Sequence, residues 1–593
     1  MALTKAKYSM IDGPIVNIKD FGAVGDGSTD DKAAIQAAID SMSNGQTLLI
    51  PSSSSFYKID ATQLSEAILV NKEIKIIIDG ELRGTTFTNQ SNPPYTIYVT
   101  ADNVIIEGSG KLSGDGTIVQ TTVDNITDPG FIRIDGDNVV IDGLTFERFP
   151  QIAVYSNQAN YVTVKNCTFY GNAVDTSGGL QYFSVRFEDS GRGCRVENNN
   201  FKSYDATHHH INVIAFLGGT HEDAIITGNY CEGALDQYMY CNLVRSIVSG
   251  NHITSGPYSV NGQGIKLNGG NDNVITNNDI SVTDSGIQLL NIYNTVVDGN
   301  KIGNLIRGYG IYLYDNASSS DHAMDNIVIS NNMISGNVSG SPSDLYGAIA
   351  IAPTVNSSNI LITGNTIHDV GFSSINSFAI EVQGSASVTV DGVLVKDNII
   401  YGSLNRSAVY LRYTTNSEIS GNRITVTGSS GTSPLRPINV RDCSNIKVNG
   451  NYIDNQVFAT ENMDTGIYFQ TTTTGIVSNN IVIGWDETGY PWGLSSLTNY
   501  GNQISVSSTL SGVFTMDAAA TKVISNTNIS SSNLTNGSIY IQLTPLNSSA
   551  AALMGSAKNL YVSAASVATS FTVATSDSSS AAGTEVFAYS IIQ

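Results

Sequence analysis

Charged side chains are scarce in this sequence of 593 residues, at 13% of the total, and most of them are acidic. The formal net charge at pH 7 is −22. A negative field of this size repels nucleic acid and anionic lipid, so the composition argues against nucleic-acid and membrane partners. An acidic polysaccharide would need arginine or lysine at its own binding site.

Cysteine motifs and long apolar runs are also absent. The five cysteines form no Cys-x-x-Cys pair and no metal-ligand spacing, and they are expected to be free and mostly buried. No metal or cofactor is expected. There is no run of 18 apolar residues, and the N-terminus lacks the apolar segment of a signal peptide. We therefore expect a soluble protein that does not use the usual secretory route.

What the sequence does contain is a repeated phrase: apolar, polar, Gly or Asn, Asn, any residue, apolar. Two of its copies are Ile226–Cys231 and Val297–Ile302, and in the main series the phrase returns about every 22 to 33 residues. Such a period is typical of solenoids. The Gly-Asn or Asn-Asn pair suits a sharp corner between two strands, because both residues tolerate positive φ. Asparagines at equivalent corners are expected to stack in hydrogen-bonded ladders.

A second kind of strand lies between these phrases and alternates apolar with polar residues. Gly264–Leu267 and Gly310–Leu313 are examples. Alternation places Ile and Leu in the core and the intervening residues on the outer face. Two or three such strands per coil predict a parallel β-helix.

The two ends of the chain differ from the repeat. Residues 28–42 predict a helix that covers the first coil, with Ser28 as N-cap and an apolar stripe that includes Ile35 and Ile39. After about Ser495 the repeat stops and Ser, Thr and Ala dominate. Four alternating segments between residues 538 and 592 predict a small antiparallel sandwich.

The string Val16–Asp31, which contains Asp-Phe-Gly-Ala-Val-Gly-Asp-Gly, resembles the N-terminal signature of the pectate-lyase-like β-helix superfamily. That superfamily includes bacteriophage tailspike depolymerases and polygalacturonase-like enzymes. The resemblance implies an all-β, right-handed parallel β-helix with an N-terminal capping helix and a C-terminal antiparallel β-sandwich. It divides the chain into a leader (1–15), a cap (16–50), the β-helix with the glycan site (51–495) and the sandwich (496–593).

The same resemblance implies a phage tailspike that depolymerises a bacterial surface polysaccharide. It further implies a homotrimer, held together by the sandwich, on the virion tail. The leader would dock to another phage tail protein. The sandwich could instead be a carbohydrate-binding module or a plain cap.

Aligned by their inward Ile and Leu, the alternating strands predict an outer face rich in aromatic and basic residues. Aromatic rings stack on sugars and arginines hold carboxylate or hydroxyl pairs, so this face is interpreted as a glycan groove. Ala350 and Ala352 would leave a hollow in it. Its substrate-binding residues are predicted to be Lys266, Tyr312, Tyr314, Tyr410, Arg412, Arg441 and Tyr468.

Catalysis is assigned to two carboxylates on this face, Glu381 and Asp315. Two coils apart, they would be separated by roughly 9 to 10 Å, the upper end of the range for an inverting glycosidase. Asp315 begins a loop, so it could cap a turn instead. A lyase that uses Tyr410 and Arg412, and a non-catalytic receptor fibre that only binds glycan, are the alternatives.

Two other acidic clusters compete for the catalytic role. Arg186, Glu188 and Asp189 form the first. The second comprises Asp205, residues 208–210 (all histidine) and residues 221–223 (His-Glu-Asp). Acid–base chemistry is open to either, whereas three consecutive histidines on a strand cannot all face one metal ion.

Overall fold

The computed structural model describes residues 15–85, 93–114, 129–149, 151–171, 183–204, 210–255, 262–305, 307–315, 323–336, 344–370, 378–404, 406–429, 435–455, 466–470, 473–483, 497–500, 502–505, 511–526, 540–554, 559–567 and 569–592. Residues 1–14 of the expected leader lie outside them. The chain forms two compact units. Unit 1 comprises Met1–Pro342 with Ala348–Leu361, and unit 2 comprises Ser343–Gly347 with Ile362–Gln593.

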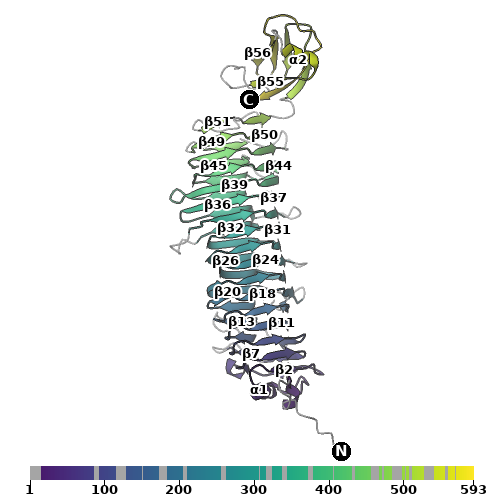
Figure 1. The fold of residues 1–593 in the computed structure, drawn as a ribbon, viewed down its shortest axis with the longest axis vertical. Coiled ribbons are helices and arrows are strands. Elements are labelled where there is room, and N and C mark those ends of the chain that lie inside the picture. The colour runs from purple at the N-terminus through teal and green to yellow at the C-terminus, as the bar shows by residue number, and fades with distance from the viewer. Residues whose placement is uncertain are drawn as a thin grey trace, which may run out of the picture. The chain divides into compact units, whose positions relative to one another are not determined.

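Each coil contains three short strands joined by two corners and a longer loop. In one coil of unit 1 these are β24 (Ile247–Ser249), β25 (His252–Thr254) and β26 (Gln263–Asn271). All three pair in parallel with β27 (Val274–Thr276), β28 (Asp279–Ser281) and β29 (Ile287–Tyr293) of the following coil. Repetition builds three parallel sheets, named A, B and C in the order of these strands (Figure 1). The predicted parallel β-helix is confirmed, with three strands per coil.

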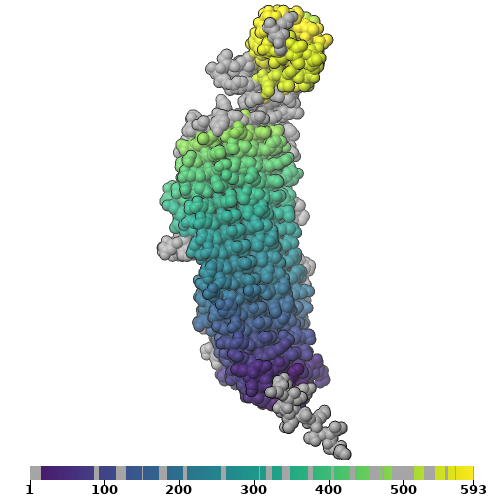
Figure 2. All heavy atoms as spheres, viewed as in Figure 1, coloured from purple at the N-terminus to yellow at the C-terminus, as the bar shows by residue number. Residues whose placement is uncertain are grey.

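Sheet C contains the predicted glycan face. Its strands in unit 1 are β4 (Ile68–Val70), β7 (Tyr95–Val99), β10 (Gly130–Ile134), β13 (Ile152–Asn157), β16 (Phe183–Glu188), β20 (His210–Glu222), β23 (Ala234–Val244), β26, β29 and β32 (Arg307–Tyr314). Those in unit 2 are β38 (Phe378–Gln383), β41 (Ser407–Arg412), β45 (Ile438–Arg441) and β48 (Ile467–Phe469), while β35 (Asp344–Ala352) has residues in both units. Within each unit the colours in Figure 2 follow one another in bands, as expected where each coil packs on its neighbours.

The predicted asparagine ladder lies inside the corners between sheets A and B. The first residue of each pair takes positive φ, as in Gly250 (φ 63°) and Asn277 (φ 56°). The second is a buried Asn whose amide bonds to the next coil. Asn278 Nδ2, for example, donates to Asn300 Oδ1 (2.9 Å) and to the Val248 carbonyl (3.0 Å). Each amide thus satisfies backbone groups that the bend would otherwise leave without partners.

The N-terminal helix is shorter than the sequence predicts. Helix α1 spans Lys32–Ser41, and its buried Ile35, Ala38 and Ile39 confirm the apolar stripe. Ser28 is not the N-cap, because the helix begins only at Lys32, and the Ser28 backbone N–H donates to Asp26 Oδ1 (2.8 Å) in a turn before it. Asp31 occupies the capping position, yet its carboxylate accepts from the Val24 N–H (2.6 Å) and the Gly25 N–H (3.1 Å) instead. Asp26 and Asp31 therefore fold the preceding loop, and the Asp31 side chain does not cap the helix.

The C-terminal segment forms two antiparallel sheets of three strands that share one core. One sheet contains β53 (Ser511–Thr515), β58 (Val586–Ile592) and β55 (Tyr540–Pro545), and the other contains β54 (Thr521–Ser525), β57 (Ser570–Thr575) and β56 (Leu560–Ser566). Phe514, Phe571 and Phe587 pack between them, together with helix α2 (Ser548–Met554). The predicted sandwich is confirmed, although β53, β54 and α2 were not foreseen.

Two smaller expectations also have outcomes. All five cysteines are free and buried. Among the described residues, no helix has both the length and the apolar character that crossing a membrane requires.

Candidate functional site

The outer face of sheet C in unit 2, hereafter the unit-2 face, is ordered by strand register. Its central column contains one residue from each of β38, β41, β45 and β48, namely Glu381, Tyr410, Asn439 and Tyr468. A second column, two residues further along each strand, contains Gln383, Arg412 and Arg441. The register therefore brings five of the predicted site residues onto one surface.

Glu381 is the part of this face best suited to acid–base chemistry. It lies in the central column, half-buried, with its strand neighbours Ile380 and Val382 in the core. Burial raises the pKa of its carboxyl to about 7, and the nearby positive charge of Arg406 opposes this rise only in part. Near neutral pH the carboxyl is thus poised between its acid and base forms, as a general acid requires.

Tyr410 supports Glu381 rather than presenting an open ring. Its side chain is only 4% exposed. The ring stacks on Phe378, with centroids 4.6 Å apart and planes 13° apart. Burial raises the pKa of the hydroxyl, although Arg441 and Arg412 oppose it. In this conformation a sugar has no free face of Tyr410 on which to stack.

Four arginines flank the central column. At the strand ends, Arg412 pairs with Asp442 (3.3 Å), and Arg441 Nε donates to Gln470 Oε1 (3.0 Å). At the strand starts, the Arg406 guanidinium lies 5.7 Å from the centroid of the Phe378 ring, and that of Arg436 lies 3.7 Å from the centroid of the Tyr468 ring. Sequence reasoning missed Arg406 and Arg436 because they precede the aligned strands. The only available signal was their position just before Ala408-Val-Tyr-Leu and Pro437-Ile-Asn-Val.

Lys266, Tyr312 and Tyr314 lie together on sheet C of unit 1. The rings of Tyr309, Tyr312 and Tyr314 form a continuous stack, with centroids 4.5 and 4.7 Å apart. The Lys266 ammonium lies 5.0 Å from the centroid of the Tyr240 ring, and burial lowers its pKa. Tyr240, which the sequence alignment of strands did not reach, occupies the equivalent position one coil earlier.

Asp315 also belongs to unit 1, where it closes a turn. It is 9% exposed. The backbone N–H of Thr354 donates to both of its carboxylate oxygens (2.7 and 2.8 Å), and that of Val355 donates to Oδ2 (3.3 Å). This geometry is that of the turn cap that the sequence left open. Ala350 and Ala352 lie in unit 1 as well, whereas Glu381 lies in unit 2.

The first competing cluster is an internal ion pair. Arg186 pairs with Glu188 on the same outer face of unit 1, and both side chains are largely buried. Two coils earlier, Arg133 pairs in the same way with Asp135 (3.0 Å). These carboxylates are therefore matched by arginines of their own strands, which favours a structural role.

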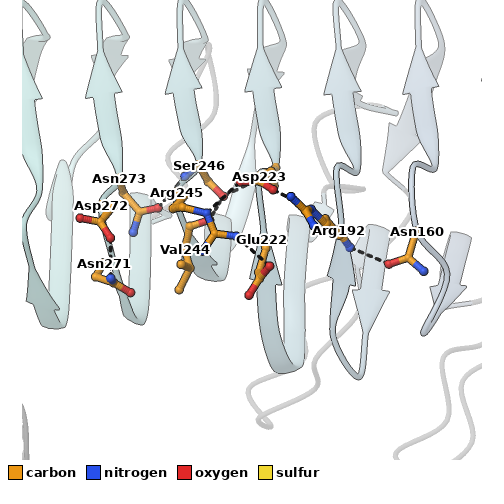
Figure 3. Close-up of polar contacts among 11 residues, drawn as sticks. Asn160, Arg192, Glu222, Asp223, Val244, Arg245, Ser246, Asn271, Asp272 and Asn273 are labelled. Atoms are coloured by element: carbon orange, nitrogen blue, oxygen red, sulfur yellow. Dashed lines mark hydrogen bonds and ion pairs between the residues drawn. The ribbon is translucent and has the colours of Figure 1, made fainter.

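The second competing cluster forms an exposed charge ladder at the corner between sheets C and A. Figure 3 shows the Asp223 carboxylate lying between Arg192 and Arg245. The contacts are 2.8 Å to Arg192 Nε and 3.1 Å to Arg245 Nε, and Arg245 also pairs with Glu222 (2.7 Å). Hydrogen bonding to Arg245 and Arg192 lowers the pKa of Asp223. A carboxylate held in this way is a poor proton donor or acceptor.

The two described histidines of this cluster, His210 and His221, are buried. Asp205, His208 and His209 lie outside the described residues. His210 Nδ1 lies 2.7 Å from Ser184 Oγ. His221 is 1% exposed, its Nε2 lies 3.0 Å from the Leu217 carbonyl, and burial lowers its pKa. Both imidazole rings are therefore packed in the core.

Comparison with known proteins agrees with the parallel β-helix seen in the structure. The family described as "Right handed beta helix region" matches residues 184–352 and 354–509. No curated protein matches the sequence.

Three solved structures illustrate the similarity. A variant tailspike protein of E. coli bacteriophage HK620, in complex with a pentasaccharide, is 13% identical over 99% of this chain and 95% of its own, with a TM-score of 0.50. The surface adhesin PfbA of Streptococcus pneumoniae is 15% identical over 70% and 91%, with a TM-score of 0.42. An exopolygalacturonase from Thermotoga maritima is 14% identical over 62% and 92%, with a TM-score of 0.38. Identities this low show a shared fold alone.

Proposed function

The chain belongs to the right-handed β-helix family, and from that premise we propose that it is a phage tailspike that binds and depolymerises a bacterial surface polysaccharide, either capsule or O-antigen. The reaction is hydrolysis of a glycosidic bond. The rigid stack of coils presents a regular outer face, which suits a polymer whose own units repeat.

The observation that carries this proposal is the state of Glu381. A half-buried carboxyl with a pKa raised to about 7 is protonated in a large fraction of molecules at neutral pH. In that form it can donate its proton to the departing glycosidic oxygen. The flanking arginines keep the substrate oriented, and Tyr410, stacked on Phe378, is the partner of Glu381 on the neighbouring strand.

The second carboxylate of the mechanism has two candidates. Asp315 remains the sequence-based prediction, but its hydrogen bonds to Thr354 and Val355 favour the structural role. Asp442 is the alternative within unit 2. It follows Arg441 directly and pairs with Arg412 (3.3 Å), so it lies at the edge of the unit-2 face. Asp315→Asn and Asp442→Asn separate the two roles.

A lyase is the first rival. Elimination would need a base beside the sugar carboxylate, and Tyr410 was the sequence candidate. Because burial raises the pKa of Tyr410, its hydroxyl loses a proton less readily than that of an exposed tyrosine. Less of the tyrosinate base is then present for elimination, which favours hydrolysis. A receptor fibre that only binds glycan is the second rival.

We further propose that the protein is a homotrimer on the virion tail, held together through its sandwich, and that the leader docks to another tail protein. Support for the trimer comes from apolar side chains on one outer sheet of the sandwich. Val523 and Tyr561, on β54 and β56, are 61% and 51% exposed. Apolar groups of this size gain free energy when a partner covers them.

The test of the enzymatic proposal compares the wild-type protein with Glu381→Gln on purified capsule and O-antigen. We expect the variant to release oligosaccharides about 10² to 10⁴ times more slowly, because the proton donor is lost. Glu418→Gln is the matched control. Glu418 lies on sheet A of the same unit, paired with Lys396 and Lys447, and its loss should leave the rate unchanged.

The products distinguish the rivals. New reducing ends without an ultraviolet-absorbing double bond indicate hydrolysis, and such a double bond indicates a lyase. Polymer that is bound but never shortened by the wild-type protein indicates a receptor fibre. Full activity of a folded Glu381→Gln protein would remove Glu381 from the mechanism.

A further inference from the structure

We propose that the arginines of the unit-2 face form a carboxylate-binding frame, and that the polysaccharide recognised there contains acidic sugars. This inference rests on the proposed function, since it names the class of substrate for the same face. It concerns two residues that the sequence did not single out, Arg406 and Arg436, as well as Arg412 and Arg441.

The strand register places these arginines on both sides of the central column. Arg412 and Arg441 are paired residues of β41 and β45, one coil apart. At the other end of the same strands, the Arg436 backbone N–H donates to the Arg406 carbonyl (2.9 Å), so these two residues are also in adjacent coils. Tyr410 and Asn439 lie between the two pairs. Both of these residues are buried, so the arginines lie on either side of a covered strip that runs along two successive coils.

Within the described residues, Arg406 and Arg441 form no ion pair with a carboxylate, although the charge of Arg406 acts on Glu381. Arg441 donates from Nε to the neutral amide of Gln470, and Arg406 lies against the Phe378 ring. Both retain donors for a further acceptor, because a guanidinium carries five N–H groups.

The arginines of the same sheet in unit 1 show what a structural arrangement looks like. Arg133 and Arg186 each pair with an acid two residues further along their own strand, Asp135 and Glu188. In unit 2, Arg441 is the last residue of β45, and Cys443, two residues after it, lies beyond the strand and is buried. Arg133 and Arg186 are thus paired with acids of their own strands, whereas Arg441 has the neutral amide of Gln470 as its acceptor.

The charge of the whole chain sharpens this contrast. The sequence has 51 acidic residues against 29 Lys and Arg. Among the described residues of this face, four arginines stand against two acids, Glu381 and Asp442, which is the reverse of the balance in the whole sequence. A local positive field inside a negative surface selects an anion at short range while the rest of the surface repels it. Carboxylate is an anionic sugar substituent that a planar guanidinium binds in bidentate fashion.

The test measures binding separately from cleavage. The full-length Glu381→Gln protein serves as the background, so that bound polymer stays intact. The probes are glucuronate-containing capsular polysaccharides, each paired with the same polymer after its carboxyl groups have been reduced to primary alcohols. Binding is measured by surface plasmon resonance at low and high salt. We expect reduction of the carboxyls to weaken binding at least about tenfold.

Two substitutions test the frame itself. Arg441→Gln and Arg406→Gln should each weaken binding of the acidic polymer by about tenfold and leave the reduced polymer unaffected. Arg441→Lys keeps the charge and should recover part of the affinity, and it also guards against a Gln variant that folds poorly. Arg423→Gln is the matched control. Its guanidinium lies 5.4 Å from the centroid of the Tyr452 ring on sheet B of the same unit, away from this face.

The binding results decide whether the arginines recognise carboxylate. Equal binding of native and reduced polymers, binding of neutral polysaccharides only, or no binding of any acidic polymer would overturn the carboxylate frame. The proposed function would still stand if the wild-type protein shortened a neutral polymer. Conversely, acidic polymers that bind through Arg441 but are never cut by the wild-type protein would support the frame and overturn the enzyme.

Discussion

At the scale of single residues, the pKa of Glu381 predicts the pH dependence of the reaction. The protonated carboxyl is the active form of a general acid, and its pKa is about 7. Raising the pH above 7 removes that proton, so kcat/KM should fall about tenfold per pH unit beyond this point. The measurement is initial-rate kinetics from about pH 5 to pH 9 at constant ionic strength. A rate that stays level across neutral pH would show that Glu381 does not donate the proton.

The same raised pKa predicts a cost in stability. The folded protein holds the Glu381 proton up to about pH 7, whereas the unfolded chain loses it near the ordinary glutamate pKa of 4.5. Between these values the unfolded state binds fewer protons, so stability falls as pH rises and the cost is fully present above pH 7. Glu381→Gln removes the cost.

Thermal unfolding at two pH values tests this sign. The variant should be more stable than the wild-type protein at pH 8, by about 1–3 kcal/mol, and equal to it at pH 4. A variant that is equally stable, or less stable, at pH 8 would mean that the Glu381 carboxylate is not desolvated in the folded protein.

At the scale of structural elements, the corners are as important as the strands. Asn278 accepts from the backbone N–H of Asn251 (3.1 Å) and from its amide (2.9 Å), and donates in turn to Asn300 (2.9 Å). Asn278→Leu has a similar volume but leaves buried donors of Asn251 without an acceptor. We expect a loss of about 2–4 kcal/mol in stability. Lys301→Ala, a side chain with 60% exposure in a neighbouring coil, should change little.

Denaturant-induced unfolding followed by circular dichroism measures both variants. If Asn278→Leu unfolded at the same denaturant concentration as Lys301→Ala, the ladder would be a consequence of the fold rather than a source of its stability.

The β-helix, the start of α1 and the Asp315 turn differ in how far the sequence could predict them. The β-helix was predictable because its two patterns, alternation and the corner Asn, depend only on residues close together in the chain. The start of α1 was not, because Asp26 accepts from the N–H groups of Ser28 and Thr29 and folds this segment into a turn before the helix. Asp315 shows the same limit for the site. Its partners Thr354 and Val355 come from the following coil, and no local pattern reveals that contact.

The unit-2 face was predictable only in part. Alternation correctly placed Glu381, Arg412 and Arg441 at outward positions. Alternation says nothing of what covers a side chain, so the burial of Tyr410 beneath Phe378 was missed. Arg406 and Arg436 were missed for a related reason. They lie in the segments before the strands, where the period of two no longer applies.

At the scale of the whole molecule, the sandwich offers the test of assembly. Val523 pairs with Thr572 and Tyr561 pairs with Ala574, so both project from the outer side of the sheet formed by β54, β57 and β56. If this side contacts a second copy, a charge placed there must be buried on assembly. Val523→Glu should therefore convert trimers into monomers while each chain stays folded, because an unpaired buried carboxylate costs several kcal/mol.

Sedimentation velocity across a range of protein concentrations measures the outcome. The matched control is Val567→Glu. Val567 is 53% exposed, close to the 61% of Val523, but it lies in the turn that links β56 to β57. A trimer that survives Val523→Glu would place the contact elsewhere on the chain, and a wild-type monomer would remove trimerisation from the proposal.

Because the site of unit 2 contains its acid and arginines within one chain, a monomeric variant should keep its activity on short oligosaccharides. What it should lose is avidity for long polymers, since three linked sites raise the effective concentration of a repeating ligand.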